Sequence, residues 1–595
     1  MKFINIKMTK FNMKKLALLL VTGLMFTSCS DLLDTEPYDQ FTKQNYFTSE
    51  TNVRLFANYF YNTFTGYGSG SGDYYFNTLN DDQASTGITN WSFTSVPGSS
   101  GAWNTPYVEI RRANTLINAI PGIASMSDVA KNNWMGIARL YRAWQHYKVV
   151  RAYGDCYWVD KELDATDEDI IYGPRQPRND VMDKVLQDLD FAAANITADG
   201  DSKVAFNKWV ALAMKAEICL YEGCYSKYVT KNNERAGNYL TEAKNACLQI
   251  MNSGKFSLSN DYKSNFDSED LAKNPEMILY KHYVLGTMGH GTIDYTCGST
   301  QVNGMTKDAF DSYLFRDGKP LATTSMDKSD KGFVVSLDDN SGYGEAKHID
   351  ISEVLAKRDP RLSAQVDHIL QFPGSGFARF GGAQSTASTG YGVLLFDNEK
   401  YAKDKDGKDT NGNRQSTYGN YSDAPIFWYA EILLDYAEAC AELAGVIPGN
   451  PGITDADLNK SINLLRDRVG MPHLTTSVGH DDANNMGVSD IIWEVRRERR
   501  VEMMYCMNDR YYSLLRWNQL DKLDTQKYPN LSRGAYVKGF DAEGVVLKDV
   551  TIDADGYINC KNNGTERIYN DKYLLFPIPN DQHNLNPQIG QNPGW

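Results

Sequence analysis

The residues best suited to chemistry in this chain are carboxylates, and one adjacent pair, Asp81-Asp82, lies in a loop-like segment. Glycoside cleavage needs two carboxyl groups on opposite sides of one bond. Adjacent loop carboxylates more often hydrogen-bond hydroxyl groups or cap a turn, and nothing in the sequence indicates a raised pKa. The chain has no HExxH, GxxxxGK or GxSxG motif, and its eight histidines pair with no visible nucleophile. The sequence therefore predicts a protein that is not an enzyme.

A second acidic run, from Asp404 to Asn411, resembles the first part of a calcium-binding loop. Gln415 stands at the twelfth position, where such a loop places a bidentate glutamate. An exposed acidic turn is the favoured interpretation. The nine cysteines contain no CxxC pair and form no cluster with histidine. We therefore predict no metal and no cofactor.

Aromatic side chains are abundant, with 37 Tyr, 24 Phe and 10 Trp. A sugar has an apolar face of C–H groups and a rim of hydroxyls, so its binding site needs an aromatic ring beside polar side chains. The loop at 66–96 supplies both kinds of group, namely Tyr74, Tyr75, Trp91 and Phe93 with Asn80, Asp81, Asp82, Gln83 and Asn90. We expect Trp91 to be the main platform; the alternative is that its indole packs onto the helices.

Further candidates lie in a later segment rich in Gly, Ser, Asp, Tyr and Lys: Tyr283, Tyr295, Arg316, Phe377, Arg379, Phe380 and Tyr391. We expect some of them to face Trp91 across a shallow groove. The predicted ligand-binding residues are Trp91, Tyr74, Tyr75, Asp81, Asp82, Asn90, Tyr283, Tyr295, Arg379 and Phe380.

The N-terminal segment predicts export. Lys14 and Lys15 precede an apolar run at 16–26, which is too short to span a bilayer. The run ends in Thr27-Ser28-Cys29, which resembles a lipoprotein lipobox, so Cys29 is the expected acylation site. An ordinary signal peptide with a chance cysteine is the alternative. The net charge of −14 argues against nucleic acid as a partner.

Apolar spacing predicts a mostly α protein. Small and apolar residues step by three and four within 209–223, 236–250 and 433–444, which is one face of a helix. The pattern indicates antiparallel helix pairs of tetratricopeptide type. The predicted organisation is a signal peptide at 1–28, a lipidated tether at 29–48 and a single domain at 49–595. That domain comprises a helical scaffold at 49–254 and 425–525, a loop-rich insertion with few short strands at 255–424, and a tail at 526–595.

Several segments, in order, resemble the SusD/RagB family of outer-membrane nutrient-binding lipoproteins. The matching segments are CSDLLDTEP from Cys29, the Trp103–Asn114 run, ARLYRAWQHYKVVRAYGD at 138–155, KWVALAMKAEICLYEG at 208–223, APIFWYAEILLDYAEACAELAG at 424–445, INLLRDRVGMP at 462–472, the arginine-rich block at 494–517, and LLFPIPNDQHNLNPQIGQNPGW at 574–595. Trp428 departs from the family, which often has arginine there.

The resemblance implies a non-catalytic protein on the outer face of the outer membrane. It implies that the protein captures oligosaccharides and delivers them to a SusC-like TonB-dependent transporter, with a loop corresponding to 66–96 contributing to glycan binding. Two alternatives stay open: a peptide-binding protein of the same uptake type, and a surface glycoside hydrolase.

Overall fold

The computed structural model describes residues 46–68, 74, 78–197, 202–297, 303–338, 345–377, 379, 385–398, 419–506, 509–560 and 564–595. Cys29, Tyr75, Phe380 and the acidic run at 404–411 lie outside the described residues, as do the predicted signal peptide and most of the tether. Within the described part, no helix is long and apolar enough to cross a membrane.

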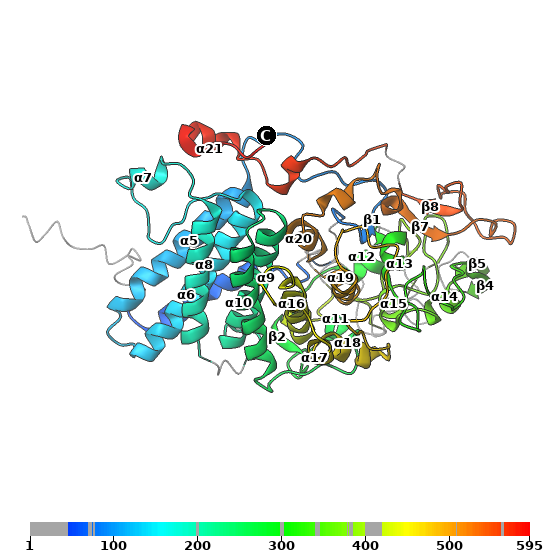
Figure 1. The fold of residues 1–595 in the computed structure, drawn as a ribbon, viewed down its shortest axis with the longest axis horizontal. Coiled ribbons are helices and arrows are strands. Elements are labelled where there is room, and N and C mark those ends of the chain that lie inside the picture. The colour runs from blue at the N-terminus through cyan, green and yellow to red at the C-terminus, as the bar shows by residue number, and fades with distance from the viewer. Residues whose placement is uncertain are drawn as a thin grey trace, which may run out of the picture.

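Five long helices form one side of the molecule (Figure 1). They are α5 (Gly101–Ala119), α6 (Asp128–Tyr153), α8 (Arg178–Asn195), α9 (Lys208–Tyr228) and α10 (Asn233–Met251), and neighbours along the chain pack on one another. Small residues permit close contact between α9 and α10: a Cβ added at Gly223 would lie 2.7 Å from Leu240 Cγ. The mostly helical prediction is confirmed. The short helices α3 (Glu50–Ala57) and η1 (Asn58–Thr63) precede this layer.

A second group of helices lies at the centre of the molecule. α16 (Tyr429–Glu442) is buried along its whole length and packs on α9, α10 and α19 (Asp490–Glu502). α20 (Asp509–Arg516) packs on α9, and α17 (Asp455–Asn459) and α18 (Ile462–Val469) pack on α16. Apolar side chains of both helical groups belong to one continuous core. That shared core holds the later helices firmly against the first ones.

The strands form two-stranded antiparallel pairs in the described part of the chain. β2 (Met277–Lys281) pairs with β6 (Ala424–Trp428), β1 (Gln83–Ala84) with β3 (Gly304–Met305), β4 (Phe333–Asp338) with β5 (Glu345–Asp350), and β7 (Arg533–Tyr536) with β8 (Tyr557–Asn559). The helix expected from residue 425 therefore begins only at Tyr429. Residues 424–428 are extended instead, because they pair with β2.

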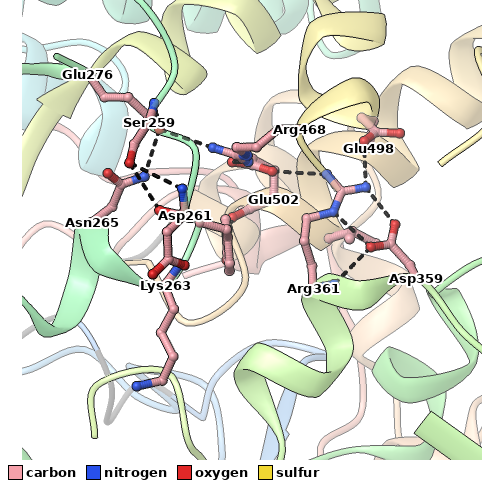
Figure 2. A network of polar contacts seen from close by, with 12 residues as sticks. Ser259, Asp261, Lys263, Asn265, Glu276, Asp359, Arg361, Arg468, Glu498 and Glu502 are labelled. Carbon is pink, nitrogen blue, oxygen red and sulfur yellow. Dashed lines mark hydrogen bonds and ion pairs between the residues drawn. The ribbon is translucent and has the colours of Figure 1, made fainter. Parts of the chain in front are cut away.

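Buried ion pairs join the insertion to the scaffold (Figure 2). Arg361, on α15 (Pro360–Gln365), contacts Glu498 at 2.7 Å and Glu502 at 2.9 Å, both on α19. Arg468 reaches Glu502 at 2.5 Å and Glu276 at 3.1 Å. These charged side chains are shielded from solvent. Burying a charge costs free energy, and their mutual ion pairs offset that cost.

The C-terminal segment runs back over the top of the molecule in Figure 1 and ends beside the first helices. The amide of Asn580, which begins α21 (Asn580–Leu585), donates to the Pro97 carbonyl at 2.9 Å. The Trp103 indole donates to the Gln582 side chain at 3.1 Å. The loop before α5 is therefore covered by residues from the other end of the chain.

Candidate functional site

Trp91, the expected platform, is buried. Only 5% of its surface is exposed, and its ring stacks on that of Tyr573 with 4.5 Å between centroids. Its indole N–H donates to the Ile568 carbonyl at 2.8 Å. The structure thus contradicts an exposed platform, and it packs the indole against the C-terminal tail rather than onto the helices as the alternative had it. The physical reason is the C-terminal tail, which brings Tyr569 and Tyr573 to a loop that has little local core.

Two of the tyrosines proposed for the groove are buried as well. Tyr74 and Tyr283 pack with Tyr67, His290 and Phe396 in one aromatic cluster. The Tyr283 hydroxyl donates to the Gly68 carbonyl at 3.1 Å, and the Tyr74 hydroxyl donates to the Pro425 carbonyl. Their rings therefore join the loop to the insertion and offer no exposed face.

The charged candidates are held in ion pairs. Asp81 accepts two hydrogen bonds from Arg510, at 2.6 and 2.7 Å, and Asp82 pairs with Arg500 at 2.8 Å. Burial alone would raise the pKa of Asp81, but Arg500 and Arg510 outweigh it and hold that pKa below its usual range. Arg379 is likewise buried and pairs with Asp367 at 2.8 Å and with Asp397. Asp82 and Arg379 thus stabilise the fold and are poorly placed to contact a ligand, whereas Asp81 also lines the cleft described next.

Two predicted residues remain accessible. Asn90 is exposed and Tyr295 is partly buried. The structure does not bring either of them together with Trp91 in a groove, because Trp91 points into the core. Tyr75 and Phe380 lie outside the described residues and stay predictions.

A cleft of about 350 Å³ is lined in part by the Asp81–Arg510 ion pair. We call it the Trp493 cleft. The rings of Trp493, on α19, and Tyr528 are both partly exposed in it. Its rim carries the polar side chains of Asp308, Asp311, Asn485, Asn530 and Lys522, and its floor the guanidinium groups of Arg496, Arg497, Arg500 and Arg510.

The arginine charges at the floor of the Trp493 cleft are neutralised by carboxylates of the protein itself. Arg497 pairs with Asp481 and with Glu494 at 3.2 Å, and Arg500 pairs with Asp308 at 2.8 Å as well as with Asp82. The Trp493 indole donates to Asp481 at 3.1 Å, which fixes its ring. Partly exposed rings beside amides and carboxylates suit a polyhydroxylated ligand.

Of the predicted ligand-binding residues that the structure describes, Asp81 alone lines this cleft, and sequence reasoning missed the rest of it. Trp493 lies in a segment predicted as helix, where a tryptophan is indistinguishable from a core residue. Tyr528 lies after the helical scaffold, and the segments at 320–322 and 481–486 that complete the wall come from distant parts of the chain. No short-range signal links them.

Two family models match the chain. The first, described as the SusD family, matches residues 275–595, more than half of the chain. The second, described as starch-binding associating with outer membrane, matches residues 31–220. The two matches together include α5, α6, α8, most of α9, the Trp493 cleft and the C-terminal tail, whereas α10 lies between the matched ranges.

Curated relatives match over a shorter span. A SusD-like protein of Bacteroides ovatus is 25% identical over 311 residues, which are 49% of this chain and 55% of the relative. SusD-like protein P38 of Formosa agariphila is 25% identical over 300 residues, which are 46% of this chain and 54% of the relative. The chain thus spans about half the length of the curated relatives it matches.

Solved structures match over nearly the whole fold. A SusD-like carbohydrate binding protein from Bacteroides fragilis has a TM-score of 0.66 at 20% identity, covering 92% of this chain and 100% of that one. Surface glycan-binding protein A from Bacteroides fluxus has a TM-score of 0.55 at 16% identity, with the same coverage. At these identities the likeness concerns the fold.

Proposed function

Because the chain belongs to the SusD family, as its motifs predicted, we propose that it is a surface lipoprotein that binds glycans without cleaving them. It would deliver them to a SusC-like TonB-dependent transporter in the outer membrane. Carbohydrate-binding proteins of the SusD family are non-catalytic. The observation that carries the proposal is the family match over residues 275–595. The second family description, which names starch and the outer membrane, supports it.

The Trp493 cleft is the proposed glycan site. Its rings, amides and carboxylates supply both halves of sugar recognition, the apolar face and the hydroxyl rim. Asn90 and Tyr295 are kept as a competing proposal, since they are the accessible part of the groove predicted from sequence.

A paired substitution tests the site. Tyr528→Ala removes one ring of the cleft, and Tyr172→Ala removes a ring that is 50% exposed and lies outside it. Loss of an aromatic anchor is expected to weaken glycan binding about tenfold or more, as at interface hot spots. Affinity is measured by calorimetry on a panel of soluble polysaccharides, with released reducing ends assayed in the same samples.

Each outcome selects one proposal. A loss confined to Tyr528→Ala supports the Trp493 cleft. A loss confined to Asn90→Ala or Tyr295→Ala places the glycan at the predicted groove. Binding of peptides but no glycan would favour the peptide-binding alternative, and sustained release of reducing ends by the pure protein would revive the hydrolase.

Surface anchoring is tested separately. Cys29→Ala should release the protein from the membrane fraction and from the surface of intact cells, because the apolar run at 16–26 cannot anchor it once cleaved. A variant that stays membrane-bound and protease-accessible contradicts the lipoprotein assignment.

A further inference from the structure

One face of α16 carries four carboxylates, Glu431, Asp435, Glu438 and Glu442, spaced by four, three and four residues. This spacing aligns them along a single stripe of the helix. Glu442 pairs with Lys227 at 2.8 Å and Arg496 at 2.9 Å. Glu438 pairs with Arg499 and Arg516, both at 2.8 Å, and Asp435 also pairs with Arg499.

The stripe ends in a carboxylate with an unpartnered oxygen. Glu431 is only 7% exposed, and its Oε2 oxygen is buried without a hydrogen-bond partner among the residues that the structure describes. Two nearby polar atoms share this condition: the second carboxylate oxygen of Asp435 and the hydroxyl of Tyr221 are buried without a hydrogen-bond partner in the described structure. Buried polar groups are nearly always satisfied in folded proteins. Further atoms of this kind occur elsewhere in the described structure, at Glu276 and Gln519 for example, but these three share one location, and that calls for a common explanation.

All three groups line one cavity of about 280 Å³, which we call the Glu431 cavity. It lies between α6, α9, β6, α16, α19 and α20. Its aromatic lining comprises Phe64, Trp144, Tyr147, Phe427 and Tyr512. Thr65 is exposed at its edge, and the Glu217 side chain is 28% exposed, so the cavity communicates with solvent.

The charges of the Glu431 cavity leave a negative surplus. The lining holds four carboxylates (Glu217, Glu431, Asp435 and Asp509) and four cations (Lys148, Arg151, Arg499 and Arg516). Arg499 and Arg516 are shared with a fifth carboxylate, Glu438, behind the wall. When all of these groups are ionised, Glu431 is the carboxylate left without a countercharge, and its protonation removes the surplus in the ligand-free protein.

A metal ion is a poor candidate for that countercharge. Among the described residues, the carboxylate oxygens of the cavity do not converge within 4.8 Å as a group of three. A cationic group on a larger molecule suits the geometry better, because the aromatic walls attract ammonium ions and contact apolar carbon.

We propose that the Glu431 cavity binds a small organic cation whose primary ammonium group contacts Glu431 and Asp435 while its carbon skeleton lies against the aromatic wall. The ammonium supplies hydrogen-bond donors to the one oxygen of each carboxylate that has none, Oε2 of Glu431 and Oδ2 of Asp435. The Tyr221 hydroxyl donates to an oxygen or nitrogen acceptor of the same ligand. This site is separate from the Trp493 cleft, and the inference does not depend on the proposed function.

Proton exchange should accompany binding. Burial, and then Asp435 on the same helix, raise the pKa of Glu431 well above its usual range. The other charged groups that act on Glu431 are Glu217 on α9, Arg499 on α19 and Asp509 on α20, while Lys148, Arg151 and Arg516 complete the lining. An arriving ammonium favours the ionised carboxylate and displaces its proton. Affinity should therefore increase as the pH rises, for as long as the ligand remains protonated.

The test uses the full-length protein and calorimetric titration with three probes. The probes are D-glucosamine, the dipeptide glycylglycine and the neutral sugar D-glucose. We expect at least one amine to bind, about tenfold or more tighter than glucose, and Glu431→Gln to weaken that binding about tenfold or more, as for truncation of a buried charge pair. The relative strengths of glucosamine and glycylglycine tell whether an amino sugar or a peptide amine is the source of the ammonium.

Controls separate binding from folding. Glu353→Gln removes an exposed carboxylate outside the cavity and should leave affinity unchanged. Tyr221→Phe removes a single hydroxyl and should weaken binding by a smaller factor, which keeps the proposal testable if Glu431→Gln folds poorly.

Three results would overturn the proposal. They are the absence of amine binding to the unaltered protein, affinity for both amines no greater than that for glucose, and amine affinity that neither Glu431→Gln nor Tyr221→Phe reduces.

Discussion

The Trp493 cleft and the Glu431 cavity lie against the same arginine-rich helix, α19, and differ in how their charges are met. Arg496, Arg497 and Arg500 face the cleft, whereas Arg499 faces the cavity. In the cleft the buried acids find arginine partners, so a ligand there can add only ring contacts and hydrogen bonds at the rim. In the cavity one carboxylate is left over, so a ligand can supply charge. The Trp493 cleft, whose charges are paired, is thus suited to recognise the shape of a ligand. The Glu431 cavity, which has an unpaired carboxylate oxygen, is suited to recognise a cation.

The largest expected change in the free energy of unfolding comes from removing a buried ion pair of the Trp493 cleft. Arg510→Met removes both hydrogen bonds that Arg510 donates to buried Asp81 and leaves Arg500, 3.3 Å away, to compensate that charge in part. The expected loss is therefore up to about 3 kcal/mol, the lower end of the cost of an uncompensated buried charge. Urea unfolding of this variant should therefore show a much lower midpoint. Arg316→Met, which alters an exposed arginine, is the matched control and should be nearly neutral. Equal midpoints for the two variants would mean that the cleft is not compensated in the way its geometry indicates.

In the Glu431 cavity, removal of a charge is expected to stabilise the protein instead of destabilising it. Because the pKa of Glu431 is raised in the folded state, this residue favours folding at low pH and opposes it increasingly as pH rises above the usual glutamate range. Glu431→Gln should therefore stabilise the ligand-free protein at about pH 8, by roughly 1–2 kcal/mol, the cost of an unsatisfied buried group. The gain should vanish near pH 4. Thermal unfolding at both pH values provides the measurement, and a destabilised variant at pH 8 would show that Glu431 has a partner after all.

The smallest effect should come from Glu217, at the mouth of the cavity. Burial raises its pKa to about 7, against the lowering influence of Arg151, whose guanidinium lies 4.0 Å away. Glu217→Gln should therefore raise stability by less than about 1 kcal/mol, since the side chain is partly solvated. The gain should develop as the pH rises from the ordinary glutamate pKa of 4.5 to the folded-state pKa of about 7, and NMR titration of the Glu217 carboxyl should report the latter value. A carboxyl that titrates at the ordinary glutamate pH would place Glu217 in open solvent.

The helices were predictable because their signal is local. Ala236, Leu240, Ala243 and Cys247 repeat at helical spacing, and each of them is buried on α10. The same pattern in Leu433, Ala437 and Cys440 marks the buried α16. Side chains three and four residues apart share a face whatever the rest of the chain does, so such a pattern can be read without tertiary knowledge.

The candidate site was harder to predict because its partners are distant in sequence. A tryptophan in a Gly/Ser-rich loop has no local core, so exposure of Trp91 was a reasonable expectation; Tyr573 overturns it from the other end of the chain. Tyr74 is buried in the same way by Phe396. The extended segment at 424–428 likewise depends on β2, about 150 residues earlier, and local propensity gives way to that pairing.

The antiparallel pairing of β2 with β6 has a consequence for how this architecture can be re-engineered or diversified. It brings the two ends of the segment at 282–423 side by side, so the closure entropy of that segment depends only weakly on its length. A segment of different size and sequence could be grafted between the same two strands without altering the helices. The graft would need a cation in place of Arg361, because Glu498 and Glu502 would otherwise each lose a buried partner, and a carboxylate in place of Asp308, which pairs with Arg500. The β2–β6 pair therefore marks the boundaries of an exchangeable segment, and Arg361 is a residue whose charge that segment must supply.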